Sequence, residues 1–344
     1  MNKKNLLLLL TALVVIMASV LTYSYYSKIY KPNTVKEGYL YIPSDASYQD
    51  VANLLRPFVK RVKPLNWVAN KKNYPAKIKA GRYFIKKGMN NNALINLLRS
   101  GNQQVLKLSF NNQDTLEKLA GRIAAQIEAD SISLLKAFKA PDFLTKNNFN
   151  VHTAISMYIP NSYEFYWNTS ADKFKQRMLK EYHRFWNTQR KAKAVKQGLS
   201  PLEVTTLASI VQKETASISE RPDVAQLYLN RLNNNWPLQA DPTVIYAIKE
   251  LKGQETVIKR VLLKDLKIKS AYNTYQISGL PPGPIGMPDI SAIDAVLSPA
   301  KHRYFYMCAD INTPGKHVFA KTLSQHNRNA RKYQQWLNRQ GVRR

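Results

Sequence analysis

Residues 200–215, which read SPLEVTTLASIVQKET, decide the fold of the region around them. The stretch opens with Ser200 at an N-cap position, Pro201 at the first helical position and Glu203 at the third. A serine accepts a hydrogen bond from the third helical N–H, a proline loses no bond at the first position, and the glutamate completes a capping box. The sequence therefore predicts a helix that runs to about Thr215.

The apolar stripe of this helix ends on a carboxylate. Leu207 and Val211 are four residues apart, and Glu214 takes the next position on the same stripe. Burial disfavours an ionised carboxyl, so in this setting the group keeps its proton to a higher pH and can act as a general acid. The alternative interpretation is that Glu214 lies near the helix end and pairs with Arg221 or Arg231.

The chain before this helix predicts a small α+β domain at residues 38–104, preceded by a polar linker at residues 27–37. Apolar runs, cap residues and turn residues give the order strand, helix, strand, helix. The expected elements are a strand at residues 39–42, a helix capped by Ser47, a strand at residues 83–85 and a helix at residues 91–98 that ends at Gly101.

A larger mixed domain is expected at residues 105–344, so the fold class is α+β. Asp114 and Glu117 resemble a capping box at the start of a helix that runs to Ile127. The prolines of residues 279–288 predict a rigid loop. The other expected elements are a strand at residues 105–110, a long basic helix at residues 171–196, a helix at residues 222–232 and a buried strand at residues 304–309 that includes Cys308.

Residues 5–26 are predicted to form a transmembrane helix. No charged residue lies between Lys4 and Lys28, and an apolar run of this length can cross a bilayer. Basic residues precede the run, which favours a cytoplasmic tail at residues 1–4 and places the rest of the chain outside the cytoplasm. The alternative is a cleaved signal peptide, for which residues 17–19 offer a weak site.

The composition restricts the partners and cofactors. The formal net charge is +30, from 52 Lys and Arg against 22 Asp and Glu, so the surface attracts polyanions such as nucleic acid, anionic lipid or a wall polymer that carries carboxylates. The basic residues are scattered and show no nucleic-acid-binding signature, so no nucleic-acid partner is expected. His302, His317 and His326 are too far apart for a helical metal motif, and neither metal nor other cofactor is expected.

Three blocks of sequence resemble, in the same order, the endolytic murein transglycosylases of the MltG/YceG-like family. The resemblance covers residues 208–327. The blocks are ASIVQKET at residues 208–215 with LQADPTVIY at residues 238–246, then SAYNTY at residues 270–275 with GLPPGPI at residues 279–285, and finally YFY at residues 304–306, HVF at residues 317–319 and SQHN at residues 324–327.

The resemblance implies a LysM-like domain at residues 38–104, a YceG-like catalytic domain at residues 105–344 and a location in the bacterial inner membrane. The glutamate of the Lys-Glu-Thr triplet falls on Glu214. It would protonate the oxygen that leaves between N-acetylmuramic acid and N-acetylglucosamine, then accept the proton of the 6-hydroxyl as this group closes on C1. This lytic transglycosylase reaction leaves a 1,6-anhydro end and terminates a nascent strand. Hydrolases, in contrast, need a second carboxylate.

Polar and aromatic residues of these blocks are candidates for binding the sugar rings, because amides and phenols supply hydrogen bonds and flat apolar faces. Glu220 could instead favour the dipole of the helix at residues 222–232, and Asp241 could instead organise a loop. The candidates are Glu220, Asn230, Gln239, Asp241, Tyr246, Asn273 and Tyr275.

One stretch departs from the family. Residues 160–163 read PNSY where the family usually has Pro-x-Thr-Tyr, and Met157 stands where a small residue is usual, which argues against sugar contacts from this loop. The expected partners are peptidoglycan glycan strands, the inner membrane through one helix, and peptidoglycan synthases. The alternative function is a noncatalytic peptidoglycan-binding scaffold of the cell envelope.

Overall fold

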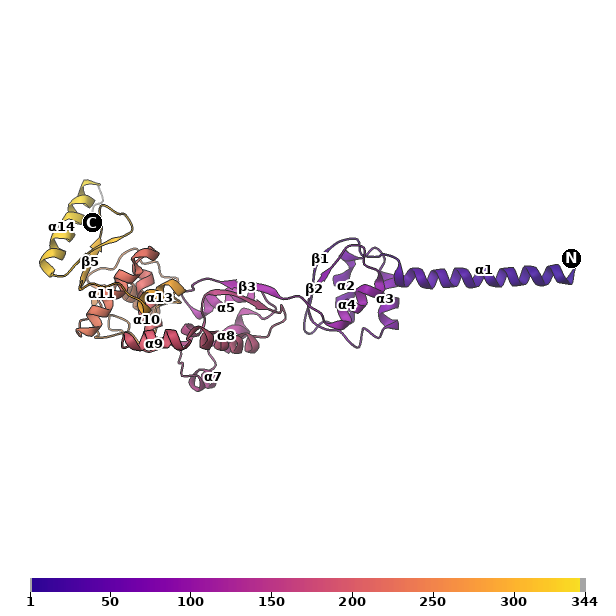
Figure 1. The fold of residues 1–344 in the computed structure, drawn as a ribbon, viewed down its shortest axis with the longest axis horizontal. Coiled ribbons are helices and arrows are strands. Elements are labelled where there is room, and N and C mark those ends of the chain that lie inside the picture. The colour runs from indigo at the N-terminus through magenta and orange to yellow at the C-terminus, as the bar shows by residue number, and fades with distance from the viewer. Residues whose placement is uncertain (1, 341–344) are drawn as a thin grey trace. The chain divides into compact units, whose positions relative to one another are not determined.

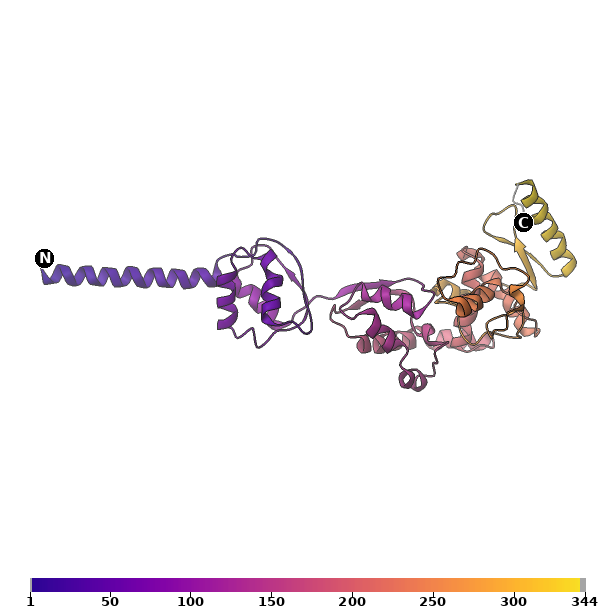
Figure 2. The same ribbon diagram turned by 180° about the vertical axis from the view of Figure 1, so that it is seen from behind.

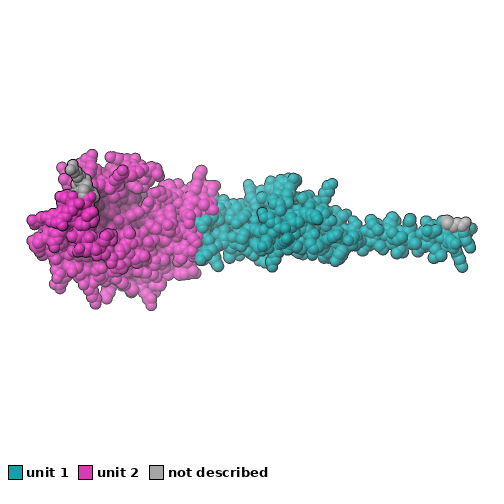
Figure 3. Space-filling model, turned by 90° about the horizontal axis from the view of Figure 1, so that it is seen from above, with its two compact units in different colours: residues 1–108, 126–129, 163–170 teal, residues 109–125, 130–162, 171–344 magenta. Residues whose placement is uncertain are grey.

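The computed structural model describes residues 2–340 of the chain. The chain divides into two compact units, which Figure 3 shows in different colours. Unit 1 comprises residues 1–108, 126–129 and 163–170, and unit 2 comprises residues 109–125, 130–162 and 171–344. Helices and short two-stranded sheets make up both units, which confirms the α+β class.

Unit 1 begins with a long helix, α1 (Lys3–Tyr30), drawn in Figure 1. Its apolar side chains are exposed over most of its length. An 18-residue window of α1 has a mean hydropathy of 2.5, so the helix is long and apolar enough to cross a membrane. The elements that follow are β1 (Gly38–Ile42), α2 (Tyr48–Leu55), a 3₁₀ turn (Arg56–Phe58), α3 (Val62–Lys71), β2 (Gly81–Ile85) and α4 (Asn91–Ser100).

The core of unit 1 forms where the β1–β2 hairpin meets its helices. The strands pair antiparallel from Gly38 opposite Ile85 to Ile42 opposite Gly81, and alternate residues of both strands are buried. Gly101, in the left-handed conformation at φ 72°, ends α4 as expected. The predicted order of strands and helices is confirmed, and α3 is an additional helix. The LysM-like character of this domain stays a prediction.

The last turn of α1 packs into unit 1. Ile29 contacts its core, and Asn91 donates a 2.8 Å hydrogen bond to the carbonyl oxygen of Lys28. Beyond the helix, the buried Asn33 side chain donates to the carbonyl oxygen of Arg61 at 2.8 Å. Part of the segment predicted as a linker is therefore ordered structure, because its polar groups satisfy backbone groups of the domain.

Unit 2 is mainly helical, and β3 and β4 form a two-stranded sheet. Its elements are β3 (Leu106–Phe110), α5 (Leu116–Ala124), α6 (Ser131–Phe138), α7 (Pro141–Lys146), β4 (Asn161–Phe165), α8 (Ala171–Phe185), α9 (Thr188–Lys196), α10 (Pro201–Glu214), α11 (Arg221–Asn233), α12 (Asp241–Lys252), α13 (Ile290–Leu297), β5 (Tyr306–Ala309), β6 (His317–Ala320) and α14 (Leu323–Arg339), with short 3₁₀ turns at Ala154–Met157, Ile218–Glu220 and Asp265–Lys267.

Two helix boundaries differ from the prediction. The expected helix at residues 171–196 is two helices, because Asn187 accepts a hydrogen bond from the Arg190 N–H and so begins α9. The helix predicted to start at Asp114 is capped instead by Thr115, and it ends at Ala124. Asp114 does not cap the helix because its carboxylate bonds to Lys213 and lies near Lys118.

Helix α10 lies at the centre of the part of unit 2 that carries the sequence blocks. It packs against α11, α12 and α13, and the β5–β6 hairpin packs against α14 (Figures 1 and 2). The strand predicted at residues 304–309 is confirmed as β5, but all its residues are only partly buried. The expectation of a buried strand was therefore wrong, because a two-stranded hairpin covered by one helix does not enclose both of its faces.

Candidate active site

Helix α10 forms as its sequence predicts and ends at Glu214. Ser200 accepts a hydrogen bond from the Glu203 N–H, and the Glu203 carboxylate accepts one from the Ser200 N–H at 2.7 Å. The residues from Val204 to Val211 are all buried. This packing fixes the helix axis, so the position of its last side chain is well defined.

Glu214 bonds to a tyrosine of the neighbouring helix. The hydroxyl of Tyr228, on α11, donates a 2.6 Å hydrogen bond to Oε1 of Glu214. Tyr228 is buried, with 1% of its surface exposed, whereas Glu214 is partly exposed. The carboxyl is thus held from the protein side, while part of the surface of residue Glu214 is exposed.

The environment of Glu214 raises its pKa from the usual 4.5 to about 7. Burial is the main cause, since removing water penalises the carboxylate. The hydrogen bond from Tyr228 lowers the pKa, the negative charge of Asp241 raises it, and His317 and Arg231 lower it. Near neutral pH, a substantial share of the molecules therefore carries a proton on this group, as a general acid requires.

The alternative interpretation, in which an arginine pairs with Glu214, is wrong. Arg221 donates to Ser291 at 2.6 Å, and Nε of Arg231 donates to the carbonyl oxygen of Phe305 at 2.8 Å. Among residues 2–340, no ion pair involves Glu214. Both guanidinium groups instead hold neighbouring segments in place.

Asp241 and Tyr275 form a second polar pair near Glu214. The Tyr275 hydroxyl donates a 2.7 Å hydrogen bond to Oδ1 of Asp241, the first residue of α12. Both residues line a pocket of about 550 Å³, walled on the other side by residues between Arg260 and Leu266. Burial, together with the charges of Asp241 and Glu214, raises the pKa of the Tyr275 phenol, so it stays protonated and able to donate.

Gln239 and Asn273 hold the chain around this pair. Gln239 adopts a left-handed backbone at φ 50°, its N–H donates to the carbonyl oxygen of Thr274 at 3.0 Å, and its side chain is exposed. Asn273 is completely buried, and its amide donates to the carbonyl oxygens of Leu266 and Ile268. Gln239 can therefore reach a ligand, whereas the Asn273 side chain is engaged within the protein.

Asn230 and Glu220 both bond to the region that follows α13. The Asn230 amide donates to the carbonyl oxygen of Tyr304 at 2.9 Å. Glu220, with 5% of its surface exposed, accepts from both the backbone N–H of His317 at 2.5 Å and its ring Nδ1 at 3.0 Å. The Glu220 side chain does not cap α11. Its two bonds instead fix β6 and bring His317 close to Glu214.

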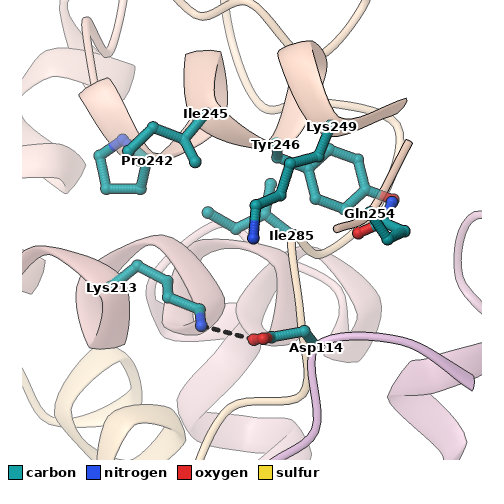
Figure 4. Close-up of a pocket in the computed structure, with 8 residues that line it drawn as sticks. All are labelled: Asp114, Lys213, Pro242, Ile245, Tyr246, Lys249, Gln254 and Ile285. Atoms are coloured by element: carbon teal, nitrogen blue, oxygen red, sulfur yellow. Dashed lines mark hydrogen bonds and ion pairs between the residues drawn. The ribbon is translucent and has the colours of Figure 1, made fainter. Parts of the chain in front are cut away.

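Tyr246 lies on α12 and faces a different pocket. Its ring packs against Tyr272 with the centroids 4.5 Å apart, and it lines a pocket together with Lys213 and Ile285 (Figure 4). Ile285 belongs to the loop at residues 279–288, and its N–H donates to the buried Ser209 hydroxyl of α10 at 3.0 Å. The loop therefore forms one wall of this pocket.

Sequence reasoning missed Tyr228 and the contact between Glu220 and His317. Tyr228 follows Val224 by four residues on α11, so helical periodicity could have placed it on the buried face, where a phenol needs a partner. Glu220 and His317 are 97 residues apart, and no local pattern reports such a contact. Among residues 2–340, no group of three or more His, Cys, Asp or Glu side chains could hold a metal ion.

A single carboxyl with a raised pKa at the end of a buried helix has the chemistry that acid–base catalysis needs. The chain belongs to the YceG-like family, whose model matches residues 40–332.

Named relatives and a solved structure agree with this assignment. An endolytic murein transglycosylase of Bacillus subtilis (strain 168) is 32% identical over 310 residues, which covers 85% of this chain and 83% of the relative. One of Streptococcus pneumoniae serotype 2 is 26% identical over 324 residues, and the match spans 57% of that longer protein. The crystal structure of a YceG-like protein from Listeria monocytogenes superposes with a TM-score of 0.57 at 27% identity, covering 85% of this chain and 98% of that one.

Proposed function

We propose that this protein is a membrane-anchored endolytic murein transglycosylase, a lyase that cleaves the bond between N-acetylmuramic acid and N-acetylglucosamine within peptidoglycan strands. The observation that carries the proposal is the carboxyl of Glu214 at the end of α10, which accepts a hydrogen bond from Tyr228 and whose pKa is raised to about 7. The relatives named for this activity support it.

Glu214 serves both halves of the reaction. In the first half its proton passes to the glycosidic oxygen, which leaves with the bonding electron pair. The resulting carboxylate is stabilised by the 2.6 Å hydrogen bond from Tyr228. In the second half the carboxylate takes the proton of the muramoyl 6-hydroxyl while that oxygen bonds to C1. The products have an anhydro end, no water is added, and Glu214 regains its proton.

We place the sugar rings in the pocket lined by Asp241 and Tyr275, because the charge of Asp241 acts on Glu214. Asp241 accepts from sugar hydroxyls, and the exposed Gln239 side chain supplies an amide. Asn230, Asn273 and Glu220 act as positioning residues, because their side chains bond to neighbouring segments of the protein, as described above.

Digestion of purified peptidoglycan by the full-length protein in detergent tests the proposal. The wild type releases fragments with anhydro ends, and Glu214→Gln, which keeps the shape and the bond from Tyr228, releases none. Products one water heavier would show a hydrolase instead. A Glu214→Gln protein that fully replaces the wild type in cells would favour the noncatalytic scaffold.

For the location, the structure supplies the 28-residue apolar helix α1, which fits a single-pass anchor. We propose that α1 lies in the inner membrane and that the chain after α1 lies outside the cytoplasm, where the murein is. We also propose that the enzyme ends strands as peptidoglycan synthases make them. Alkaline phosphatase fused to the C-terminus should be active, since it matures only after export. A fluorescent protein fused to the C-terminus that fluoresces in the cytoplasm would contradict this orientation.

A further inference from the structure

A second pocket lies beside α10, and neither Asp241 nor Tyr275 lines it. It has a volume of about 140 Å³ and is formed by α10, α12 with the residues after it, Asp114 in the segment before α5, and the loop at residues 279–288 (Figure 4). A water molecule takes about 30 Å³ of liquid, so the pocket has room for roughly five, enough for a short chemical group but not for a sugar ring with its substituents. The lining residues are Asp114, Lys213, Pro242, Ile245, Tyr246, Lys249, Gln254 and Ile285.

The charge of the pocket is positive. Lys213 bonds to Asp114 at 2.6 Å, and Lys118 lies 3.6 Å from the same carboxylate. The third lysine, Lys249, has no hydrogen bond or ion pair to any of residues 2–340, and Figure 4 shows its ammonium group pointing between Lys213 and Tyr246. Three cations thus surround one anion, and one cation is available to a ligand.

The walls of the pocket are apolar. Pro242, Ile245 and Ile285 face the ammonium groups across the space in Figure 4. Apolar walls with a few charged groups suit a ligand that has a carboxylate on a short alkyl or peptide stem. Such walls also reduce the water around the lysines, which strengthens an ionic contact made there.

The pocket is close to the catalytic carboxyl along two chain segments. Lys213 directly precedes Glu214 on α10, and Pro242 directly follows Asp241 on α12. The pocket and Glu214 are therefore carried by the same helix, α10, and the pocket and Asp241 by the same helix, α12. The muramic acid at that bond carries a peptide branch.

We propose that this pocket binds a carboxylate of the peptide attached to the muramic acid residue at the cleavage site, with Lys249 as its ionic partner. The inference rests on the proposed function and adds a specificity site to it. Asp114 accepts an N–H of the peptide, while Pro242 and Ile285 contact its small alkyl side chains. A phosphate group fits less well, because it has no donor for Asp114 and is repelled by that carboxylate.

The test compares glycan strands that carry their peptides with the same strands after an amidase has removed them. Full-length protein in detergent is assayed for anhydro-ended products, and the ratio of kcat/KM for the two substrates is measured. Lys249→Gln should lower this preference for peptide-bearing strands about tenfold, because one charge-assisted contact is lost. The lowered preference should come from a higher KM for the peptide-bearing strands. The wild type should show the same lowered preference when the carboxyl groups of the peptides are amidated.

Lys252→Gln is the matched control, since Lys252 is exposed in the last turn of the same helix and does not line the pocket. It should leave the preference unchanged. The inference is overturned if Lys249→Gln changes both substrates equally or neither, or if inorganic pyrophosphate competes while amidation has no effect. If the wild type releases no anhydro-ended products from either substrate, the proposed function itself is wrong.

Discussion

The hydroxyl of Tyr228 and Oε1 of Glu214 are 2.6 Å apart, and the hydroxyl is the donor. Burial and the charge of Glu214 keep the pKa of this phenol well above its usual value, so Tyr228 stays protonated throughout the working range of pH. The bond is stronger when Glu214 is ionised than when it is neutral. Tyr228 therefore controls how readily the carboxyl gives up its proton.

Replacement of Tyr228 by Phe should shift the pH profile of kcat/KM towards higher pH. The general acid must be protonated, so the activity of the wild type should fall as the pH rises through about 7. Loss of the bond destabilises the carboxylate and raises the pKa of Glu214, by roughly one unit for a bond of this kind. The alkaline limb, measured by product release from pH 5 to 9, should move up, and a downward shift would contradict the role assigned to Tyr228.

Replacement of Asp241 by Asn should shift the alkaline limb of the pH profile of kcat/KM towards lower pH. The charge of Asp241 raises the pKa of Glu214, so its removal lowers that pKa and the activity declines at a lower pH. The amide oxygen of the introduced asparagine can still accept the hydrogen bond from Tyr275, which keeps the local geometry. An alkaline limb that stays in place would show that Asp241 exerts no charge effect on the acid.

The raised pKa of Glu214 also makes the stability depend on pH. Between pH 4.5 and about 7 the folded protein binds more protons at this group than the unfolded chain does, so stability falls as the pH rises through this range. The contribution is about 3 kcal/mol at most. Glu214→Gln lacks it, and its melting temperature relative to wild type should be higher at pH 8 than at pH 5. The exposed Glu255→Gln is the control and should show no such difference.

Replacement of Glu220 by Ala should loosen the β5–β6 hairpin. The substitution leaves the His317 N–H and ring nitrogen without the buried acceptor they now share, at a cost of about 2 kcal/mol or more. Hydrogen exchange at the amide of His317 should become faster in the variant than in the wild type. The amide of Leu119, which is buried in α5, is the reference and should exchange at the same rate in both. Unchanged protection of His317 would mean that the hairpin does not depend on Glu220.

Replacement of Gly283 by Ala should displace the proline-rich loop. A Cβ there would clash with the carbonyl oxygen of His152, so the backbone must move, which typically costs about 1–3 kcal/mol. Gly121→Ala is the control, because its Cβ meets nothing within 4 Å and alanine favours a helix. The Gly283 variant should melt at a lower temperature and lose activity, and an unaffected variant would show that the loop tolerates the shift.

The sequence predicts the features that depend on neighbours in the chain. The capping box of Ser200 and Glu203, the end of α10 at Glu214 and the left-handed Gly101 follow from local hydrogen bonding and backbone preference, and all are confirmed. Local reasoning failed at Asp114, where Lys213, 99 residues away, takes the carboxylate that could have capped α5. A local pattern cannot show such competition from a distant charge.

The pairing within the site was not predictable in the same way. Helical periodicity places Glu214 and Tyr228 on buried faces but does not say that α10 and α11 bring them together. The resemblance to a family supplied the choice of Glu214, while the packing of α11 supplied its partner. The roles of Asn230 and Asn273 depend on carbonyl groups of other segments, which a sequence does not reveal.

Arg231 donates to the carbonyl oxygens of Phe305 and Leu238, and these bonds tie its guanidinium to the backbone. In the proposed reaction, Glu214 becomes an anion after the first proton transfer, and the charge of Arg231 acts on it. Because this cation is tethered, it can lower the energy of the anion from a distance without neutralising it. The enzyme can thus reuse the same oxygen atoms within one turnover.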